Sequence, residues 1–174
     1  GSEMCIRDSP IQDMNRNEYN LSVDKFSDDV FRFIYKTCHN KELAEDIIQD
    51  AYMVLWEHVG EITFEKAKAF LFTTSYHKMI DIFRREKRNK DIENINPEYY
   101  LSGTQSPDLQ DILEFALNKL SPVQKTVILL RDYENYSYQE IADITHLSES
   151  QVKVYIFRAR NSMKEFIRKP DLIV

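Results

Sequence analysis

Three strings of the form Ser-x-x-Gln or Ser-x-x-Glu follow one another in the last third of the chain, at Ser121–Gln124, Ser137–Glu140 and Ser148–Gln151. In each string the serine hydroxyl can accept a hydrogen bond from the backbone N–H three residues later. The Gln or Glu side chain can in turn accept one from the serine N–H, so each string predicts a helix start. The chain also has only three glycines, which leaves little of the turn chemistry that β-hairpins need. An all-α fold is therefore expected.

The segment from Ser137 to Arg160 is SYQEIADITHLSESQVKVYIFRAR. Its spacing predicts a short capped helix, a tight turn at Thr145–Leu147 and a longer capped helix, which together make a helix-turn-helix. Five apolar residues can form the small core that fixes the angle between the two helices: Ile141, Ala142, Leu147, Val152 and Ile156. A helical bundle with a mixed-charge surface would show the same periodicity, so on the pattern alone this alternative stays open.

The second helix of this motif would present a polar and basic face to solvent. The outward residues that we expect to contact DNA are Ser150, Gln151, Lys153, Val154, Tyr155, Arg158 and Arg160. Gln151 lies near the helix start, where a recognition helix meets base edges, and glutamine can pair with adenine through two hydrogen bonds. Lys153, Arg158 and Arg160 suit the phosphates, which position a protein on DNA but do not specify a sequence.

Three further helices are expected in the first half of the chain. Apolar residues at helical spacing begin at Val23, Asn40 can cap a second helix that Gly60 ends, and a third covers about 66–88. The inward stripe of the second helix is expected to be Leu43, Ile47, Ala51, Val54 and Leu55. That of the third is expected to be Leu71, Ser75, Met79 and Ile82. These helices can bury one another's stripes as a small domain.

Residues 89–107 are polar, include two prolines and a glycine and show no period, so they predict a linker. The expected domains are therefore 14–88 and 108–170. Ser106 would cap the first helix of the second domain, with Pro107 at its first position. Residues 1–13 are interpreted as a cleavage scar followed by translated adapter sequence, or as a disordered segment, with Met14 as the expected native start.

The net charge is −6, which alone argues against a nucleic-acid partner, because phosphates attract a basic surface. The charge is uneven, however. Basic residues cluster at 84–88 and again at 153–160, whereas acidic residues gather at 42–50. Residues 109–174 contain nine basic and nine acidic residues, so the attraction of this half to DNA would be weak. Net charge does not decide between a DNA partner and a protein partner.

No catalytic or metal-binding motif is present in the sequence. Cys5 and Cys38 lie far apart, and the four histidines lack the H-E-x-x-H spacing. Neither G-x-S-x-G nor a phosphate-binding loop occurs. We therefore expect no enzyme, no metal and no cofactor. No apolar run reaches the roughly 18 residues of a spanning helix, and no signal peptide precedes the fold, so a cytoplasmic protein without membrane insertion is expected.

The segment YSYQEIADITHLSESQVKVYIFRAR closely resembles region 4.2 of bacterial sigma factors, and LNKLSPVQKTVILLRDYENYS resembles region 4.1. LAEDIIQDAYMVLWEH resembles region 2.2, whose D-x-x-Q-[ED]-x-[FY] pattern appears as Asp46, Gln49, Asp50 and Tyr52. KAFLFTTSYHKMIDIFRREKR resembles regions 2.3 and 2.4, with His77 in place of the usual Asn. His146 stands where many relatives have Gly. With no third, larger sigma domain, the chain is similar to the extracytoplasmic function (ECF) group of the sigma-70 family.

This resemblance implies a transcription initiation factor that binds core RNA polymerase and promoter DNA. The clamp helices of the largest polymerase subunit would contact Asp46, Gln49, Asp50 and Met53, and the polymerase flap is a further expected partner. The −10 element would be bound and melted by Phe72, Tyr76, His77, Arg84, Arg85 and Arg88. The −35 element would be bound by the outward residues 150–160 named above. Melting needs rings or amides that replace lost base stacking, although a packed or solvated His77 is the alternative.

The resemblance also implies regulation, because relatives are often held inactive by an anti-sigma factor. In relatives the linker enters the cleft of the polymerase, although a plain tether predicts the same composition. Two other functions stay open. One is a helix-turn-helix regulator that acts without polymerase, which would leave the acidic face and the aromatic third helix without a role. The other is a sigma factor brought to promoters by an auxiliary DNA-bound protein, including an RNA-guided one.

Overall fold

The computed structural model describes residues 13–89 and 108–168, and within these ranges the backbone is helical and contains no strand. The all-α prediction is thus confirmed. Contacts divide the chain into two compact units between Lys78 and Met79, a point inside helix α3. The domain boundaries expected from the sequence remain predictions, and most of segments 1–13 and 89–107 lies outside the described residues.

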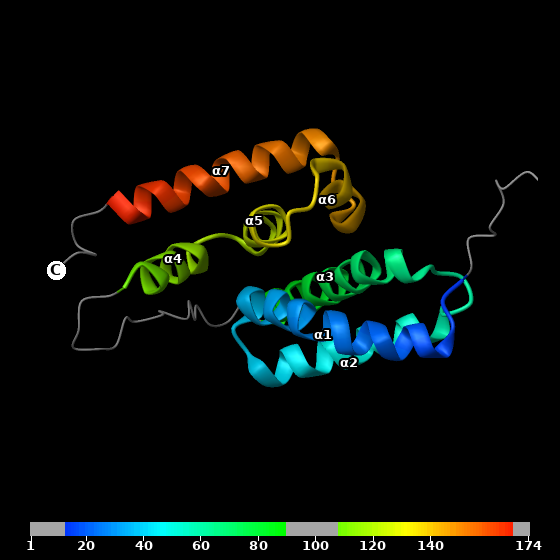
Figure 1. Ribbon diagram of the computed structural model, residues 1–174. Coiled ribbons are helices and arrows are strands. Elements are labelled where there is room, and N and C mark those ends of the chain that lie inside the picture. The colour runs from blue at the N-terminus through cyan, green and yellow to red at the C-terminus, as the bar shows by residue number, and fades with distance from the viewer. Residues whose placement is uncertain (1–12, 90–107, 169–174) are drawn as a thin grey trace, which may run out of the picture. The chain divides into compact units, whose positions relative to one another are not determined.

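The first unit begins with helices α1 (Arg16–Cys38), α2 (Lys41–Glu57) and the start of α3 (Phe64–Asn89). The Asn15 side chain caps α1 in a reciprocal capping box with Glu18, and Asn40 caps α2 as predicted. Between α1 and α2 the chain reverses at His39, which has a left-handed backbone conformation. As a result α1 and α2 lie side by side, with α3 along them (Figure 1).

The core of this unit matches the predicted stripes in part. Ile47, Ala51, Leu55, Leu71 and Ser75 are buried, whereas Leu43 and Val54 are only half-buried. In the rest of α3, beyond the unit boundary, Met79 is buried and Ile82 is half-buried. Tyr52, which was expected only as part of a family pattern, is buried as well. Its hydroxyl donates to the Ser22 carbonyl (3.0 Å) and accepts from Ser27 Oγ (3.2 Å), and burial raises the pKa of this phenol. These bonds fix the register of α1 against α2.

The second unit contains α4 (Leu109–Asn118), α5 (Pro122–Ile128), a π-helical turn (Leu129–Tyr133), α6 (Tyr138–Thr145) and α7 (Glu149–Arg168). The three predicted capping boxes are all formed, at Ser121–Gln124, Ser137–Glu140 and Ser148–Gln151. The predicted start of α4 at Ser106 was wrong. Asp108 caps this helix, because Asp108 and Asp111 form the same reciprocal bonds two residues later.

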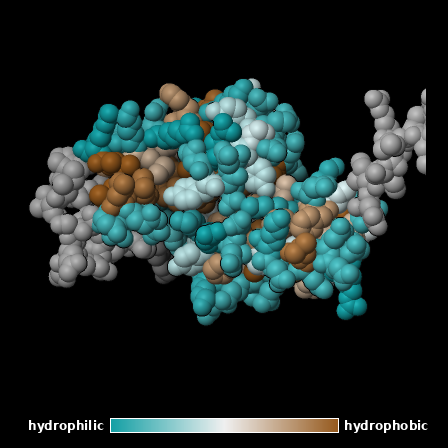
Figure 2. Space-filling model, viewed as in Figure 1, coloured by the Kyte–Doolittle hydropathy of each residue, from teal (hydrophilic) through white to brown (hydrophobic). Residues whose placement is uncertain are grey.

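Helix α7 packs against α4, α5 and α6, and α6, the turn and α7 form the predicted helix-turn-helix. Ile141, Val152 and Ile156 are buried between these helices as predicted, whereas Leu147 is only half-buried. His146 ends α6 with φ 56° and ψ 28°, the left-handed conformation that a glycine adopts more easily. Hydrophobic side chains also gather where the end of α7 faces α4 (Figure 2).

Candidate nucleic-acid and protein interfaces

The outward face of α2 combines acidic and apolar side chains. Asp46 and Gln49 are exposed, and the Met53 side chain is 63% exposed. Asp50 differs from its neighbours, because it is half-buried and forms an ion pair with Lys78 of α3. Three of the four residues predicted to contact polymerase are therefore open to a partner, whereas the fourth also ties α2 to α3.

Trp56 extends this face toward α1, and the sequence reasoning did not select it. Its side chain is 47% exposed, and its ring meets the edge of the Tyr19 ring at a centroid distance of 5.0 Å. The Tyr19 hydroxyl donates to the Tyr52 carbonyl (3.1 Å), and burial raises the pKa of Tyr19. Trp56 follows Met53 by three residues, about one helical turn, and this spacing was the sequence signal that places both residues on one face. The outward face of α2 is thus bounded by an aromatic pair on its α1 side.

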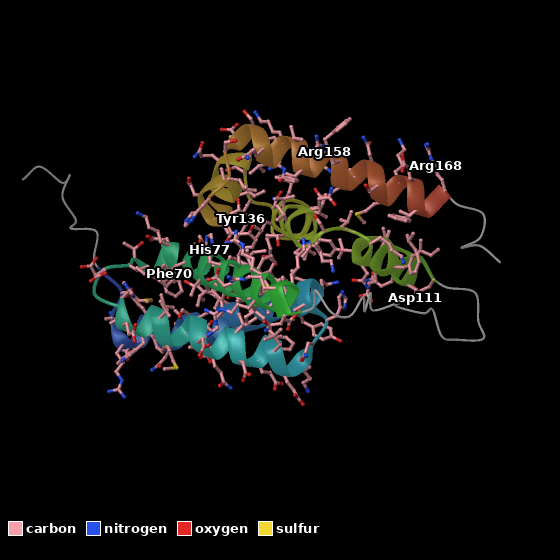
Figure 3. All side chains as sticks on the ribbon, turned by 180° about the vertical axis from the view of Figure 1, so that it is seen from behind. Phe70, His77, Asp111, Tyr136, Arg158 and Arg168 are labelled. Atoms are coloured by element: carbon pink, nitrogen blue, oxygen red, sulfur yellow. The ribbon has the colours of Figure 1, made fainter. Side chains whose placement is uncertain are left out.

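Helix α3 holds the aromatic residues predicted to melt DNA, and the structure changes this prediction. Phe72 is fully buried and packs edge-on against Phe33, with ring centroids 5.0 Å apart. It is therefore a core residue, and its ring is not available to a base. Tyr76 is also buried, at 4% exposed, with its ring 5.0 Å from that of His77. His77 is half-buried and lies two turns after Phe70 (Figure 3).

The last turns of α3 carry the predicted basic cluster. Arg84, Arg85 and Arg88 are all exposed, and Arg88 Nε lies 3.4 Å from the Arg84 carbonyl oxygen. These cationic side chains lie at the carboxyl end of α3, where their charge interacts favourably with the helix dipole. They also suit contacts to a nucleic-acid backbone.

The outward face of α7 matches the prediction for a recognition helix. The residues expected at this face are exposed, apart from the half-buried Tyr155: Ser150, Gln151, Lys153, Val154, Arg158 and Arg160. Gln151 has a second role that the sequence already contained. Its Oε1 accepts a hydrogen bond from the Ser148 N–H (2.9 Å) as part of the capping box. While the cap is intact, the Gln151 Nε2 group and the second lone pair of Oε1 remain for a base.

Two of the three predicted phosphate contacts on α7 have carboxylate partners. Lys153 pairs with Glu149 of the same helix at 3.0 Å, and Arg160 pairs with Asp132 of the π-helical turn at 2.6 Å. The hydrogen bond to Asp132 raises the pKa of Arg160. Arg158, by contrast, is exposed and forms no ion pair with a described residue (Figure 3).

A second cationic group flanks the start of α6. The Arg131 guanidinium lies 4.6 Å from the Tyr138 ring centroid and donates to the Tyr136 carbonyl (2.8 Å). Lys153 Nζ lies 5.5 Å from the same ring. Within the described ranges, no helix is long and apolar enough to cross a membrane, and no three metal-ligating side chains converge.

Two models of one family match this chain. Sigma-70 region 2 matches residues 23–89, and Sigma-70, region 4 matches residues 110–163. The chain belongs to the sigma-70 family of RNA polymerase sigma factors, and to its ECF kind, as the sequence predicted. This membership implies binding to RNA polymerase and promoter recognition, and sigma factors have no catalytic role of their own.

Among curated relatives, the ECF RNA polymerase sigma factor SigM of Bacillus subtilis (strain 168) is 26% identical over 144 residues, which cover 80% of this chain and 88% of SigM. The RNA polymerase sigma factor YlaC of the same organism is 27% identical over 178 residues, or 95% of this chain and 96% of YlaC. Both matches span the two sigma regions in one alignment.

Two solved structures share the fold. The sigma factor RpoE in complex with the anti-sigma factor NepR from Bartonella quintana has a TM-score of 0.73 at 23% identity, covering 88% of this chain and 99% of that one. CnrH in complex with the cytosolic domain of CnrY has a TM-score of 0.63 at 20% identity, covering 88% and 89% of the two chains.

Proposed function

We propose that this sigma factor docks on the clamp helices of polymerase through the outward face of α2, defined by Asp46, Gln49, Met53 and Trp56. The observation that supports this most is the exposed Met53 beside exposed acidic and amide groups. Interface centres favour such apolar and aromatic anchors, and flanking charges set register and association rate. Asp50 contributes its charge to this face and also holds α3 through Lys78.

We further propose that α7 binds the −35 element, with Arg158 as the main phosphate contact. The −10 element is opened at His77 of α3, whose ring is supported by the ring of Tyr76. A flipped base needs a stacking or hydrogen-bonding partner in place of its lost neighbours, and a half-buried imidazole can supply both. Arg84, Arg85 and Arg88 hold the backbone beside it. Phe72 has no part in this proposal, because it is buried in the core.

The domains expected from the sequence, 14–88 and 108–170, serve these two tasks, with residues 89–107 as the tether between them. An anti-sigma factor is the proposed regulatory partner, since the sigma factor RpoE from Bartonella quintana, which shares this fold, is bound to the anti-sigma factor NepR in its structure. A cytoplasmic protein that acts together with polymerase fits this proposal.

Transcription in vitro with purified core polymerase tests the whole proposal. The full chain should co-purify with core polymerase and direct initiation from a defined set of promoters. A protein that binds promoter DNA equally well with and without core polymerase, and that never co-purifies with it, would instead be a free-standing helix-turn-helix regulator.

A further inference from the structure

Two apolar side chains are exposed on the outward face of α7. Val154 is 44% exposed and Phe157 is 67% exposed. They are three residues apart, so they lie on one face of the helix, about 4.5 Å apart along its axis. Ser150 and Arg158, also exposed, belong to the same outward side, whereas Val152, Ile156 and Ala159 are buried on the opposite one. The packing of the second unit therefore does not need Val154 or Phe157.

The chemistry of the major groove limits what such a pair can contact. Each base pair presents donors and acceptors there, and A·T pairs also present the C5-methyl group of thymine, which apolar side chains can contact. The polar alternative is restricted on this helix. The Gln151 amide is already engaged, because its Oε1 accepts a hydrogen bond from the Ser148 N–H, which restricts where the amide can point. Between the polar and charged side chains of the outward face, Val154 and Phe157 form an apolar pair.

We propose that Val154 and Phe157 recognise the C5-methyl groups of one or two thymines in the −35 element. This inference rests on the proposed binding of α7 to that element. It adds Phe157, absent from the residues predicted to bind DNA, and it specifies the group that is recognised. Arg158 and Lys153 on either side would hold the backbone, so that the apolar pair faces the groove.

Replacing thymine by deoxyuracil removes only this methyl group and tests the inference directly. Holoenzyme made from the full chain and core polymerase first selects its preferred −35 sequence from duplexes randomised at that element. Each thymine of the selected site, on both strands, is then replaced singly by deoxyuracil and the dissociation constant is measured. We expect one or two positions at which the loss of one methyl contact weakens binding about fourfold.

The variants Val154→Ala and Phe157→Ala should bind the thymine and deoxyuracil duplexes equally at the position that each side chain contacts. Leu109→Ala is the matched control, because it shortens another exposed apolar side chain of the same unit and should leave the wild-type ratio unchanged. Circular dichroism of each variant verifies the helical fold.

Two results would overturn the inference while the proposed −35 binding stands. Either no thymine is sensitive to loss of its methyl group, or the sensitivity is the same in the wild type and in both variants, which indicates an effect of DNA shape. If holoenzyme initiates at promoters but selects no −35 sequence at all, both the inference and the proposed role of α7 are wrong.

Discussion

The Asp132 carboxylate accepts two hydrogen bonds from the Arg160 guanidinium, at 2.6 Å from Nη2 and 3.4 Å from Nε. The two residues belong to the π-helical turn and to α7, so the pair joins the helix-turn-helix to the segment before it. Asp132 takes two of the five N–H donors of this guanidinium and offsets its charge. Arg158 lies about half a turn earlier on α7, is exposed and forms no ion pair with a described residue. We therefore expect the two arginines of the Arg-Ala-Arg sequence to have different roles.

Arg160→Ala and Arg158→Ala should consequently affect different measurements. Removing Arg160 leaves Asp132 without its partner and should lower the free energy of unfolding by at most about 1 kcal/mol, because both groups are partly exposed. Removing Arg158 should leave stability unchanged and reduce the salt dependence of promoter binding by about one phosphate contact. Urea unfolding and binding across a salt series give both values. An equal change in salt dependence for the two variants would contradict this division.

Gln151→Glu separates the two roles of Gln151. A glutamate keeps the capping box with Ser148 but has no Nε2 donor. We expect unchanged helicity, a general weakening from the added negative charge, and a changed preference at a single −35 base pair. Gln151→Ala removes the cap as well and should also lower thermal stability. If selection from randomised duplexes returns the same site for wild type and Gln151→Glu, the glutamine is only a cap.

Asp46→Lys tests the docking face of α2 more cleanly than a change at Asp50. The Asp46 side chain is exposed, whereas reversing Asp50 would also place two lysines together by removing the partner of Lys78. Loss of charge complementarity should weaken binding to core polymerase about tenfold without loss of helicity. Asp28→Lys on α1 makes the same charge change at another exposed site. If the two variants bind core polymerase with equal affinity, this face of α2 does not dock on polymerase.

His77→Ala should separate polymerase binding from strand opening. Core binding and closed-complex formation should persist, because backbone contacts suffice for duplex DNA. Opening of the −10 region should fall strongly and recover in part on a template already mismatched there, where most of the unstacking cost is absent. Permanganate reactivity of unpaired thymines measures the opening of the intact and of the mismatched template. Tyr76 is buried, so Tyr76→Phe is preferred to truncation as its companion variant. Full opening of intact duplex by His77→Ala would show that melting depends on other residues.

Ser75→Ala should stabilise the first unit. The Ser75 hydroxyl is buried in α3 and has no hydrogen-bond partner among the described residues, so the folded state bears its desolvation cost, about 1 kcal/mol or more. Ser22→Ala is the matched control. Ser22 is equally buried, but its hydroxyl donates to the Tyr19 carbonyl at 2.7 Å, so this variant should destabilise. Urea midpoints of the two variants should therefore move in opposite directions, and a shift in the same direction would contradict the argument.

Local patterns predicted the local features of this protein well. The serine caps at 121, 137 and 148 were found because both partners of each cap lie within four residues. The core was harder to predict in α3. Leu71 and Phe72 are adjacent and therefore point in different directions from the helix, so helical periodicity alone could not predict that both are buried. The pairs Asp50–Lys78 and Asp132–Arg160 each join residues 28 positions apart. No sequence period reports such a contact, and the different roles that we expect for Arg158 and Arg160 depend on it.

The four capping boxes of the second unit have a consequence for synthesis of the chain. Each helix start from α4 to α7 is fixed by hydrogen bonds between residues three positions apart. At the usual 5–20 residues per second, both partners of a cap leave the ribosome within about a second of each other. Little loop-closure entropy opposes such short contacts, and proteins rich in them fold fast. The DNA-binding half can therefore acquire its helix boundaries during translation, before its own hydrophobic core is complete.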